Sequence, residues 1–165
     1  MKLDSFDIKI LQQLQTDSSQ SVHALAEQVG LSHTPCWRRI KRLQENGIIS
    51  ANVALIDAKK VGLGVVVFVT VKLTSHDEKL LNQFESSAVA MDEVMQCYIM
   101  SGDVDYLLRV VVQSIEQYEQ TLKRKLVKLP GVSALNSSFA LRELKNQHRL
   151  PWSLVSTGTR QAGTY

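Results

Sequence analysis

The spacing of apolar residues in the first part of the chain predicts three short helices. After Asp4, apolar side chains recur every three or four residues, and Asp is a residue type that caps helices. Ser21 can cap a second helix, which Gly30 would end. Ser32 precedes a third helix, which runs to a stop at Gly47. Because only a short turn separates the second helix from the third, the pattern is that of a helix-turn-helix.

The period of the apolar residues shortens after this region. Residues 48–56 and 63–74 are rich in Val, Ile and Thr and predict strands, whereas residues 76–89 return to helical spacing. The following segments predict two strands, a helix and a last strand, over residues 94–100, 106–112, 115–126 and 132–141. From residue 63 onward the order is strand, helix, strand, strand, helix, strand. This order is typical of a ferredoxin-like βαββαβ domain.

Together the two halves predict an α+β protein. We expect residues 1–60 to form a winged-type helix-turn-helix with a linker strand, and residues 61–150 to form the ferredoxin-like domain. Residues 151–165 contain Ser, Thr, Gly and Gln with little periodicity, which predicts a loosely ordered tail without an assigned function.

Composition and charge narrow the classes of protein to consider. The 165 residues are 44% hydrophobic and 21% charged, which is typical of a globular protein. A net charge of +3 is too small to identify a nucleic-acid partner, so the distribution of charge matters more. Cys36 and Cys97 have no companion at metal-site spacing, and no signal or membrane segment is apparent. We therefore expect a cytoplasmic protein without a metal or a cofactor.

The third predicted helix has the composition of a DNA-reading helix. Residues 33–42 include four basic side chains and no acidic one. In a helix-turn-helix the second helix of the pair lies in the major groove and presents its N-terminal residues to the bases. We expect base contacts from His33, Thr34, Trp37 and Arg38, and phosphate contacts from Ser32, Arg39, Lys41 and Arg42.

Two alternatives remain open for this helix at the level of sequence. A basic helix face is often simply solvated, without binding nucleic acid. Trp37 can pack against the first helix instead of meeting DNA.

The turn between the third and fourth predicted strands of the chain is the candidate for a ligand-binding loop. Gly102 allows a close approach of the backbone, and a nearby carboxylate can bind the ammonium group of an amino acid. Gly and Asp are also what any tight turn prefers, so an ordinary turn is the alternative. The candidate contacts are Met100, Ser101, Gly102, Asp103, Asp105 and Tyr106.

Several stretches of this sequence closely resemble the Lrp/AsnC (leucine-responsive, feast/famine) transcriptional regulators. The resemblance covers nearly everything before residue 151. It is carried by Leu3-Asp4, Asp7 to Leu11, Leu25-Ala26, Gly30 to Ser32, Pro35 to Leu43, Gly47 to Ile49, Gly102 to Val110 and Ser137 to Phe139.

The resemblance implies a DNA-binding regulator with an effector site and an oligomeric state. Members of that family pair through the sheet of the ferredoxin-like domain into dimers, which commonly assemble into tetramers or octamers. They bind amino acids or related metabolites at subunit interfaces, around the stretch that matches residues 102–105. The segment 64–71 is almost wholly apolar, which agrees with a sheet that a second subunit covers on its other face.

Two other functions are considered beside a site-specific, effector-responsive regulator. One is an architectural protein whose oligomers wrap double-stranded DNA with little sequence preference. The other is an enzyme fused to a helix-turn-helix. No paired carboxylates, activated nucleophile, phosphate-binding Gly loop or metal cluster is apparent in the sequence, so we expect no enzyme.

Overall fold

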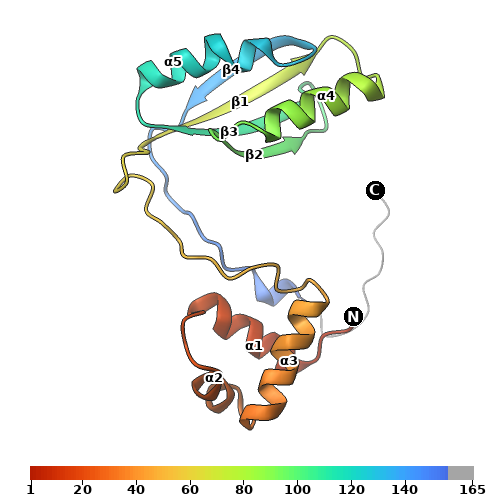
Figure 1. Cartoon of the computed structure of the whole chain (residues 1–165), viewed down its shortest axis with the longest axis vertical. Coiled ribbons are helices and arrows are strands. Elements are labelled where there is room, and N and C mark those ends of the chain that lie inside the picture. Colours follow the sequence, from red (N-terminus) through yellow and green to blue (C-terminus); the bar gives the residue numbers. More distant parts are fainter. Residues whose placement is uncertain (156–165) are drawn as a thin grey trace. The chain divides into compact units, whose positions relative to one another are not determined.

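The computed structural model describes residues 1–155, which form two compact units (Figure 1). The helical unit comprises residues 1–55 and 145–155, and the ferredoxin-like unit comprises residues 56–144. The sequence predicted a separate tail at the end of the chain, whereas the last described residues pack with the N-terminal helices. Within the described residues, no helix is both long and apolar enough to cross a membrane.

Local capping explains where the N-terminal helices begin and end. Helix α1 (Ser5–Thr16) starts with a capping box between Asp4 and Asp7, in which each side chain accepts the other's backbone N–H. The Ser21 hydroxyl caps α2 (Val22–Val29). Helix α3 (His33–Glu45) follows directly.

The turn between α2 and α3 depends on Gly30, whose φ of 75° lies in the left-handed region that favours glycine. The three helices enclose one small apolar core. Its buried members are Ile10, Leu11, Leu25, Ala26, Val29, Cys36 and Leu43.

The predicted strand at residues 48–56 is wrong. The segment has no regular secondary structure after residue 50, and Val53, Leu55 and Ile56 are about two-thirds exposed or more, at 71%, 68% and 68%. A strand needs a neighbour for its backbone hydrogen bonds, and the four described strands pair only with one another. Strand propensity alone therefore does not form a strand here, and the described helix-turn-helix carries no wing.

The ferredoxin-like unit follows the predicted order of elements. Its strands form one antiparallel sheet in the order β2-β3-β1-β4, and a 3-10 turn (Leu126–Lys128) follows the second helix. The elements are β1 (Val65–Leu73), α4 (Glu78–Val89), β2 (Val94–Ile99), β3 (Tyr106–Val112), α5 (Ile115–Arg124) and β4 (Val132–Phe139).

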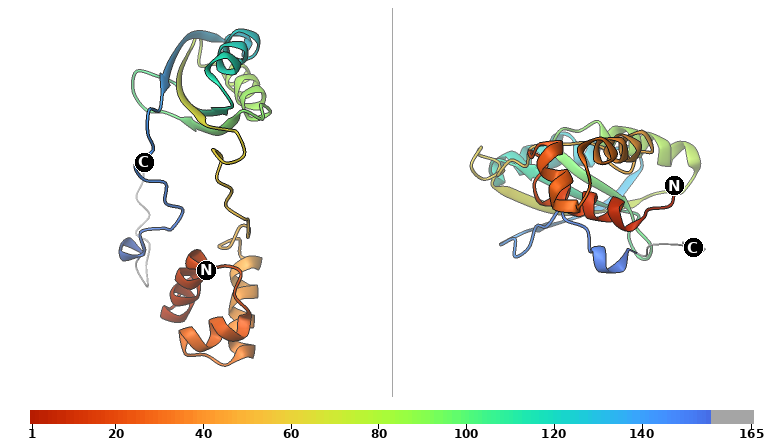
Figure 2. Two further views of the ribbon diagram at one scale, coloured as in Figure 1. Left: turned by 90° about the vertical axis from the view of Figure 1, so that its left-hand side faces the viewer. Right: turned by 90° about the horizontal axis from the view of Figure 1, so that it is seen from below.

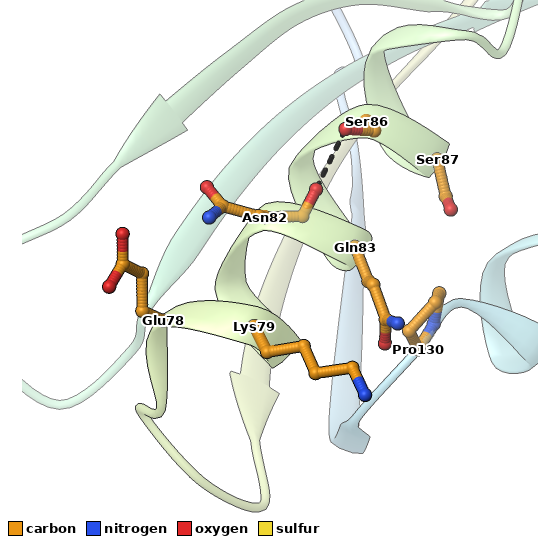
Figure 3. A pocket seen from close by; sticks show the side chains of 7 residues that line it. All are labelled: Glu78, Lys79, Asn82, Gln83, Ser86, Ser87 and Pro130. Atoms are coloured by element: carbon orange, nitrogen blue, oxygen red, sulfur yellow. Dashed lines mark hydrogen bonds between the residues drawn. The ribbon is translucent and has the colours of Figure 1, made fainter.

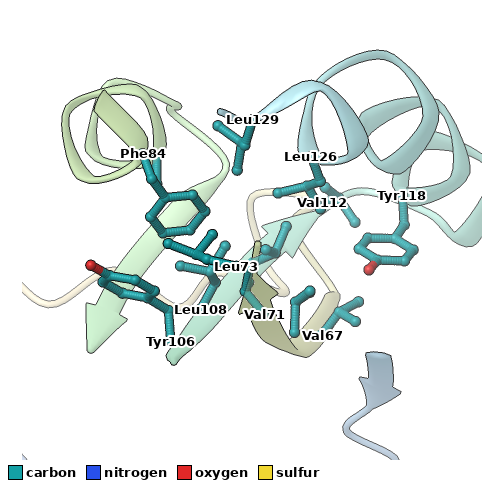
Figure 4. Packing of buried hydrophobic residues seen from close by; sticks show 13 residues of the cluster. Val67, Val71, Leu73, Phe84, Tyr106, Leu108, Val112, Tyr118, Leu126 and Leu129 are labelled. Carbon is teal, nitrogen blue, oxygen red and sulfur yellow. The ribbon is translucent and has the colours of Figure 1, made fainter. Parts of the chain in front are cut away.

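The core of this unit lies between one face of the sheet and the two helices (Figures 2 and 4). Alternate residues of β1, such as Val67, Val69 and Val71, are fully buried on this face. On the opposite face the side chains of Phe68 and Tyr98 are 39% and 49% exposed. Residues 1–155 thus cover only one face of the sheet.

The C-terminal segment folds back onto the helical unit instead of forming a loose tail over its described part. A short 3-10 turn (Trp152–Leu154) ends the described chain, and the half-buried Trp152 packs against the helical core. The remainder of the predicted tail, residues 156–165, lies outside the described residues.

Candidate functional site

The burial of α3 fixes which of its faces is exposed. Cys36 and Leu43 are fully buried in the helical core, and Ile40 packs against it. The opposite face carries the exposed side chains of His33, Thr34, Trp37, Arg38 and Lys41. These five are the predicted DNA-facing residues that the structure brings together on one open helix surface.

Trp37 lies on the exposed face and is absent from the helical core. Its side chain is 46% exposed, and the Lys41 ammonium lies 5.3 Å from the centroid of its ring. This distance is within the range of a cation–π interaction. Of the two alternatives considered for Trp37, packing against the first helix is not supported, because the ring is absent from the core that α1 shares with α3.

Arg39 and Arg42 point toward α1 and bind acidic side chains there. Arg39 Nη1 donates to Asp4 Oδ2 at 2.6 Å and to Asp7 Oδ1 at 2.8 Å. Arg42 Nη2 donates to both oxygens of Asp7, at 2.8 and 2.7 Å. The Asp7 carboxylate is fully buried, and these guanidinium groups compensate its charge.

The electrostatics of this cluster favour the charged forms. Partial burial raises the pKa of the Asp4 carboxyl, but the backbone N–H of Asp7 and the Arg39 guanidinium outweigh it and hold that pKa below its ordinary value. The pKa of Arg39 is raised, chiefly by the hydrogen bond to Asp4. Burial lowers this pKa, and the hydrogen bond to Asp7 raises it further.

The contacts with Asp4 and Asp7 give two arginines of α3 a structural role beside the phosphate contacts that the sequence predicts for them. Arg39 and Arg42 hold α3 against α1. Arg39 retains 24% of its side-chain exposure and Arg42 retains 47%, so Arg42 keeps more surface for a phosphate. The sequence marks Asp4 as a helix cap, but its pairing with Arg39, 35 positions away, follows only from the packing of α1 against α3.

The start of α3 differs from the starts of α1 and α2. Ser32 occupies the N-cap position, but its side chain makes no capping hydrogen bond. Ser32 is exposed and directly precedes the first backbone N–H groups of the helix, where the positive end of the helix dipole favours an anion.

The predicted ligand loop is an exposed turn between β2 and β3. Gly102 has a φ of 115°, a conformation that side-chain-bearing residues rarely adopt, and beyond its two neighbours in the chain no atom lies within 4 Å of where a Cβ would be. Met100, Ser101 and Asp103 are exposed beside it. A backbone hydrogen bond of 2.9 Å from Met100 N to Asp105 O closes the turn.

Asp105 is already engaged by protein groups. Its Oδ2 accepts the backbone N–H of Leu73 at 2.7 Å, and its Oδ1 lies 2.7 Å from His76 Nε2. The Leu73 N–H and the His76 imidazole lower the pKa of the Asp105 carboxyl. Asp105 therefore joins the turn to the end of β1, a role that sequence reasoning missed.

Tyr106 points into the core and away from the surface of the turn. It is 2% exposed, its ring centroid lies 4.5 Å from that of Phe84, and its hydroxyl donates to Glu85 Oε1 at 2.7 Å. Burial, followed by the Glu85 carboxylate, raises the pKa of the phenol. The turn thus presents four of the six predicted effector contacts, Met100 to Asp103, at the surface.

A shallow polar concavity lies elsewhere on this unit, along the outer face of α4 (Figure 3). None of its lining residues belongs to the turn. They are Glu78, Lys79, Asn82, Gln83, Ser86, Ser87 and Pro130. Among residues 1–155, no group of three or more His, Cys, Asp or Glu side chains is placed to hold a metal ion.

Comparison with families of known proteins gives two matches that together span most of the chain. The AsnC-type helix-turn-helix domain matches residues 3–44, and the Lrp/AsnC ligand binding domain matches residues 66–150.

Curated relatives cover the same range. The chain is 42% identical over 149 residues to the DNA-binding transcriptional activator DecR of Escherichia coli K12, which covers 90% of this chain and 98% of DecR. It is 42% identical over 152 residues to the glutamate uptake regulatory protein of Zymomonas mobilis, which covers 91% of each chain.

Solved structures share the fold. A crystal structure of an AsnC family transcriptional regulator from Agrobacterium tumefaciens has a TM-score of 0.87 and 44% identity, over 92% of this chain and 98% of that one. The transcriptional regulator NMB0573 from Neisseria meningitidis, in complex with L-Met, has a TM-score of 0.87 and 34% identity, over 92% and 97%.

Proposed function

Because this chain belongs to the Lrp/AsnC family of transcriptional regulators, we propose that its α3 reads operator DNA and that its ferredoxin-like unit binds an amino acid. The observation that carries the DNA part is the exposed face of α3. Its aromatic and basic side chains point outward from a helix whose other face is locked into the core. Within residues 33–42 no acidic side chain offsets this charge.

Different exposed side chains of α3 contact the bases and the phosphates of the DNA. We assign base-edge contacts to Arg38 and Trp37, because Arg pairs bidentately with guanine and an aromatic ring can meet a thymine methyl group. Lys41 and Ser32 suit phosphates. Arg39 acts indirectly, by holding α3 in position through Asp4 and Asp7.

The effector proposal rests on the turn 100–106 and on the relatives. The neighbour NMB0573 was crystallised with L-Met, and the Zymomonas relative is named for glutamate uptake. Gly102 leaves open space above the backbone, and Asp103 offers an exposed carboxylate to an ammonium group. Asp105 and Tyr106 shape the turn from below instead of contacting the ligand.

A second copy of the chain is part of the proposal. The described residues leave uncovered the face of the sheet that carries Phe68 and Tyr98, and burying it against a second copy would place two α3 helices in one dimer. Two such helices predict an operator with two half-sites. A regulator of this kind acts where the chromosome lies, so we place the protein in the cytoplasm.

Selection of bound fragments from a random pool of double-stranded DNA tests this function. We expect enrichment of a pseudo-palindromic sequence, because two equivalent reading helices bind two related half-sites. Retention of DNA without enrichment would favour the architectural alternative, whose affinity comes from phosphate contacts alone. Absence of any DNA retention would reject the proposal.

A further inference from the structure

The end of the described chain is hydrogen-bonded to α1 through a single side chain of that helix. We call residues 145–155 the C-terminal strap. Gln15 Nε2 donates to the His148 carbonyl at 3.3 Å, and Gln15 Oε1 accepts the Leu150 N–H at 3.1 Å and the Trp152 indole N–H at 2.8 Å. The side-chain amide of Gln15 thus forms hydrogen bonds with every second residue of the strap from His148 to Trp152.

An apolar contact adds to these hydrogen bonds. The Trp152 ring is half-buried against the core that holds the three helices together. Its indole N–H is satisfied by Gln15, as is usual for a tryptophan at the edge of a core. Packing and hydrogen bonding therefore specify the same docked position.

The docked strap gives the three helices a second, non-covalent attachment to the rest of the chain. The chain leaves the helical unit after residue 55, forms the ferredoxin-like unit, and returns at residue 145. The first connection, residues 51–57, has no regular secondary structure and is exposed throughout. A unit held by one such linker reorients freely, whereas two attachments reduce the orientations it can adopt.

We propose that Gln15 and Trp152 form a latch that restricts the orientation of the helical unit, and that they thereby determine which spacing of operator half-sites a dimer accepts. The inference rests on the proposed function, since it requires two DNA-reading units per dimer. Preorganised reading helices favour one spacing, whereas released units adapt to several. Gln15 and Trp152 are positioning residues and contact no DNA.

Spacing discrimination measures this effect directly. Three DNA ligands are compared: the selected operator, the same operator with an insertion between its half-sites, and an isolated half-site. The insertion is about 5 bp long, which is half a helical turn of DNA. The variants are Gln15→Ala and Trp152→Ala. The matched control is Gln12→Ala, which makes the same substitution on the same helix and whose side chain has no hydrogen bond to the strap among the described residues.

We expect the unsubstituted protein and Gln12→Ala to bind the inserted operator roughly tenfold more weakly than the selected one, and the latch variants to lose most of this ratio. Binding to the isolated half-site should stay unchanged in all of them. A ratio that survives in both latch variants would overturn the latch. The latch would also be overturned if the latch variants lost as much affinity for the isolated half-site as for the selected operator. Gln15 would then support the fold of the helical unit and not its orientation.

Fluorescence shows whether the strap is released. In a Trp37→Phe background Trp152 is the remaining tryptophan of the chain, which has two. Adding Gln15→Ala should shift its emission to the red as the ring meets water, whereas Gln12→Ala should not. Unshifted emission in Gln15→Ala would contradict the latch. If the unsubstituted protein bound no half-site, DNA binding itself would be rejected, an outcome distinct from failure of the latch.

Discussion

At the scale of residues, the basic side chains of α3 fall into two groups, one bound to acidic side chains and one exposed. Arg39 and Arg42 bind the carboxylates of Asp4 and Asp7 on α1, while Arg38 is exposed on the outer face. The first group sets the position of the helix, because a buried carboxylate is tolerated only with its partners in place. The second group is available to DNA.

Asp105 makes stability depend on pH in a predictable direction. Its pKa is lowered in the folded protein from an ordinary value of 3.8, so its contribution is present above that value and is lost as the pH falls through the folded pKa. We expect Asp105→Asn to lower the unfolding temperature by a similar amount from pH 7 down to about pH 5, and this difference to shrink as the pH falls below 3.8 toward pH 2.

Circular dichroism melts of both proteins across this pH range check the prediction. Asp103→Asn, on the same turn and exposed, is the control and should change little at any pH. A difference for Asp105→Asn that is constant with pH would contradict a role for the ionised carboxylate at Leu73 and His76.

The hydrogen-bond partners of the side chains are the feature of the site that is least predictable from the sequence. The exposed set on α3, including Thr34, Trp37 and Arg38, follows from helical periodicity once the buried positions are known. The pairing of Arg39 with Asp4 spans 35 positions and depends on how α1 and α3 pack. Likewise, the inward direction of Tyr106 follows from its register on β3, which no local pattern reveals.

At the scale of elements, helices were predicted well because they close their hydrogen bonds locally. The caps Asp4 and Ser21 stand where the sequence placed them, and β3 has the predicted bounds Tyr106–Val112. The strand expected at residues 48–56 failed because a strand needs a neighbour, and its Val and Ile residues have none among the described strands.

The start of β4 shows a tight contact between elements. Gly131 has a φ of +72°, and a Cβ there would lie 2.5 Å from a side-chain carbon of Leu80 on α4. We expect Gly131→Ala to lower the free energy of unfolding through both backbone strain and overpacking. The packing part should amount to about 1–3 kcal/mol.

Gly62→Ala isolates the packing part of that cost. Gly62 has a similar φ of +86°, but nothing lies within 4 Å of its Cβ position. Urea denaturation of the two variants should therefore show the larger loss for Gly131→Ala. Equal losses would contradict a cost of packing against Leu80.

At the scale of the whole molecule, the uncovered sheet face requires an explanation. Phe68 lies on the central strand β1 and is 39% exposed on the side away from the core. We expect Phe68→Asp to convert a dimer into a monomer, because pairing would bury a carboxylate from each copy. Light scattering after size exclusion measures this. Val127→Asp, at a residue 56% exposed on the 3-10 turn, is the control, and a Phe68→Asp dimer would place the interface elsewhere.

The effector site gives a second prediction at this scale. A thermal-shift screen of the common amino acids should raise the unfolding temperature for at least one of them, since a ligand at about 100 times its Kd stabilises the folded state by about 2.7 kcal/mol. Gly102→Val combined with Asp103→Ala should abolish the shift, and Gly62→Val should retain it. A shift that survives the double substitution would move the effector site away from this turn.

The path of the chain end is the whole-molecule feature that sequence could not supply. The tail composition predicted a loose end, yet Trp152 and Gln15 meet across 137 positions. A single Trp and a single Gln carry no periodic signal, so only the folded helices create the surface that receives the strap.

Binding of the selected operator by Arg38→Ala tests the central claim, that the exposed face of α3 reads DNA. Anisotropy titrations should show operator affinity weakened by about 1–3 kcal/mol and random DNA nearly unaffected, because a base contact is lost. Arg124→Ala, an exposed arginine on α5, is the matched control and should bind as the unsubstituted protein does. Unchanged affinity of Arg38→Ala for both DNAs would contradict the account.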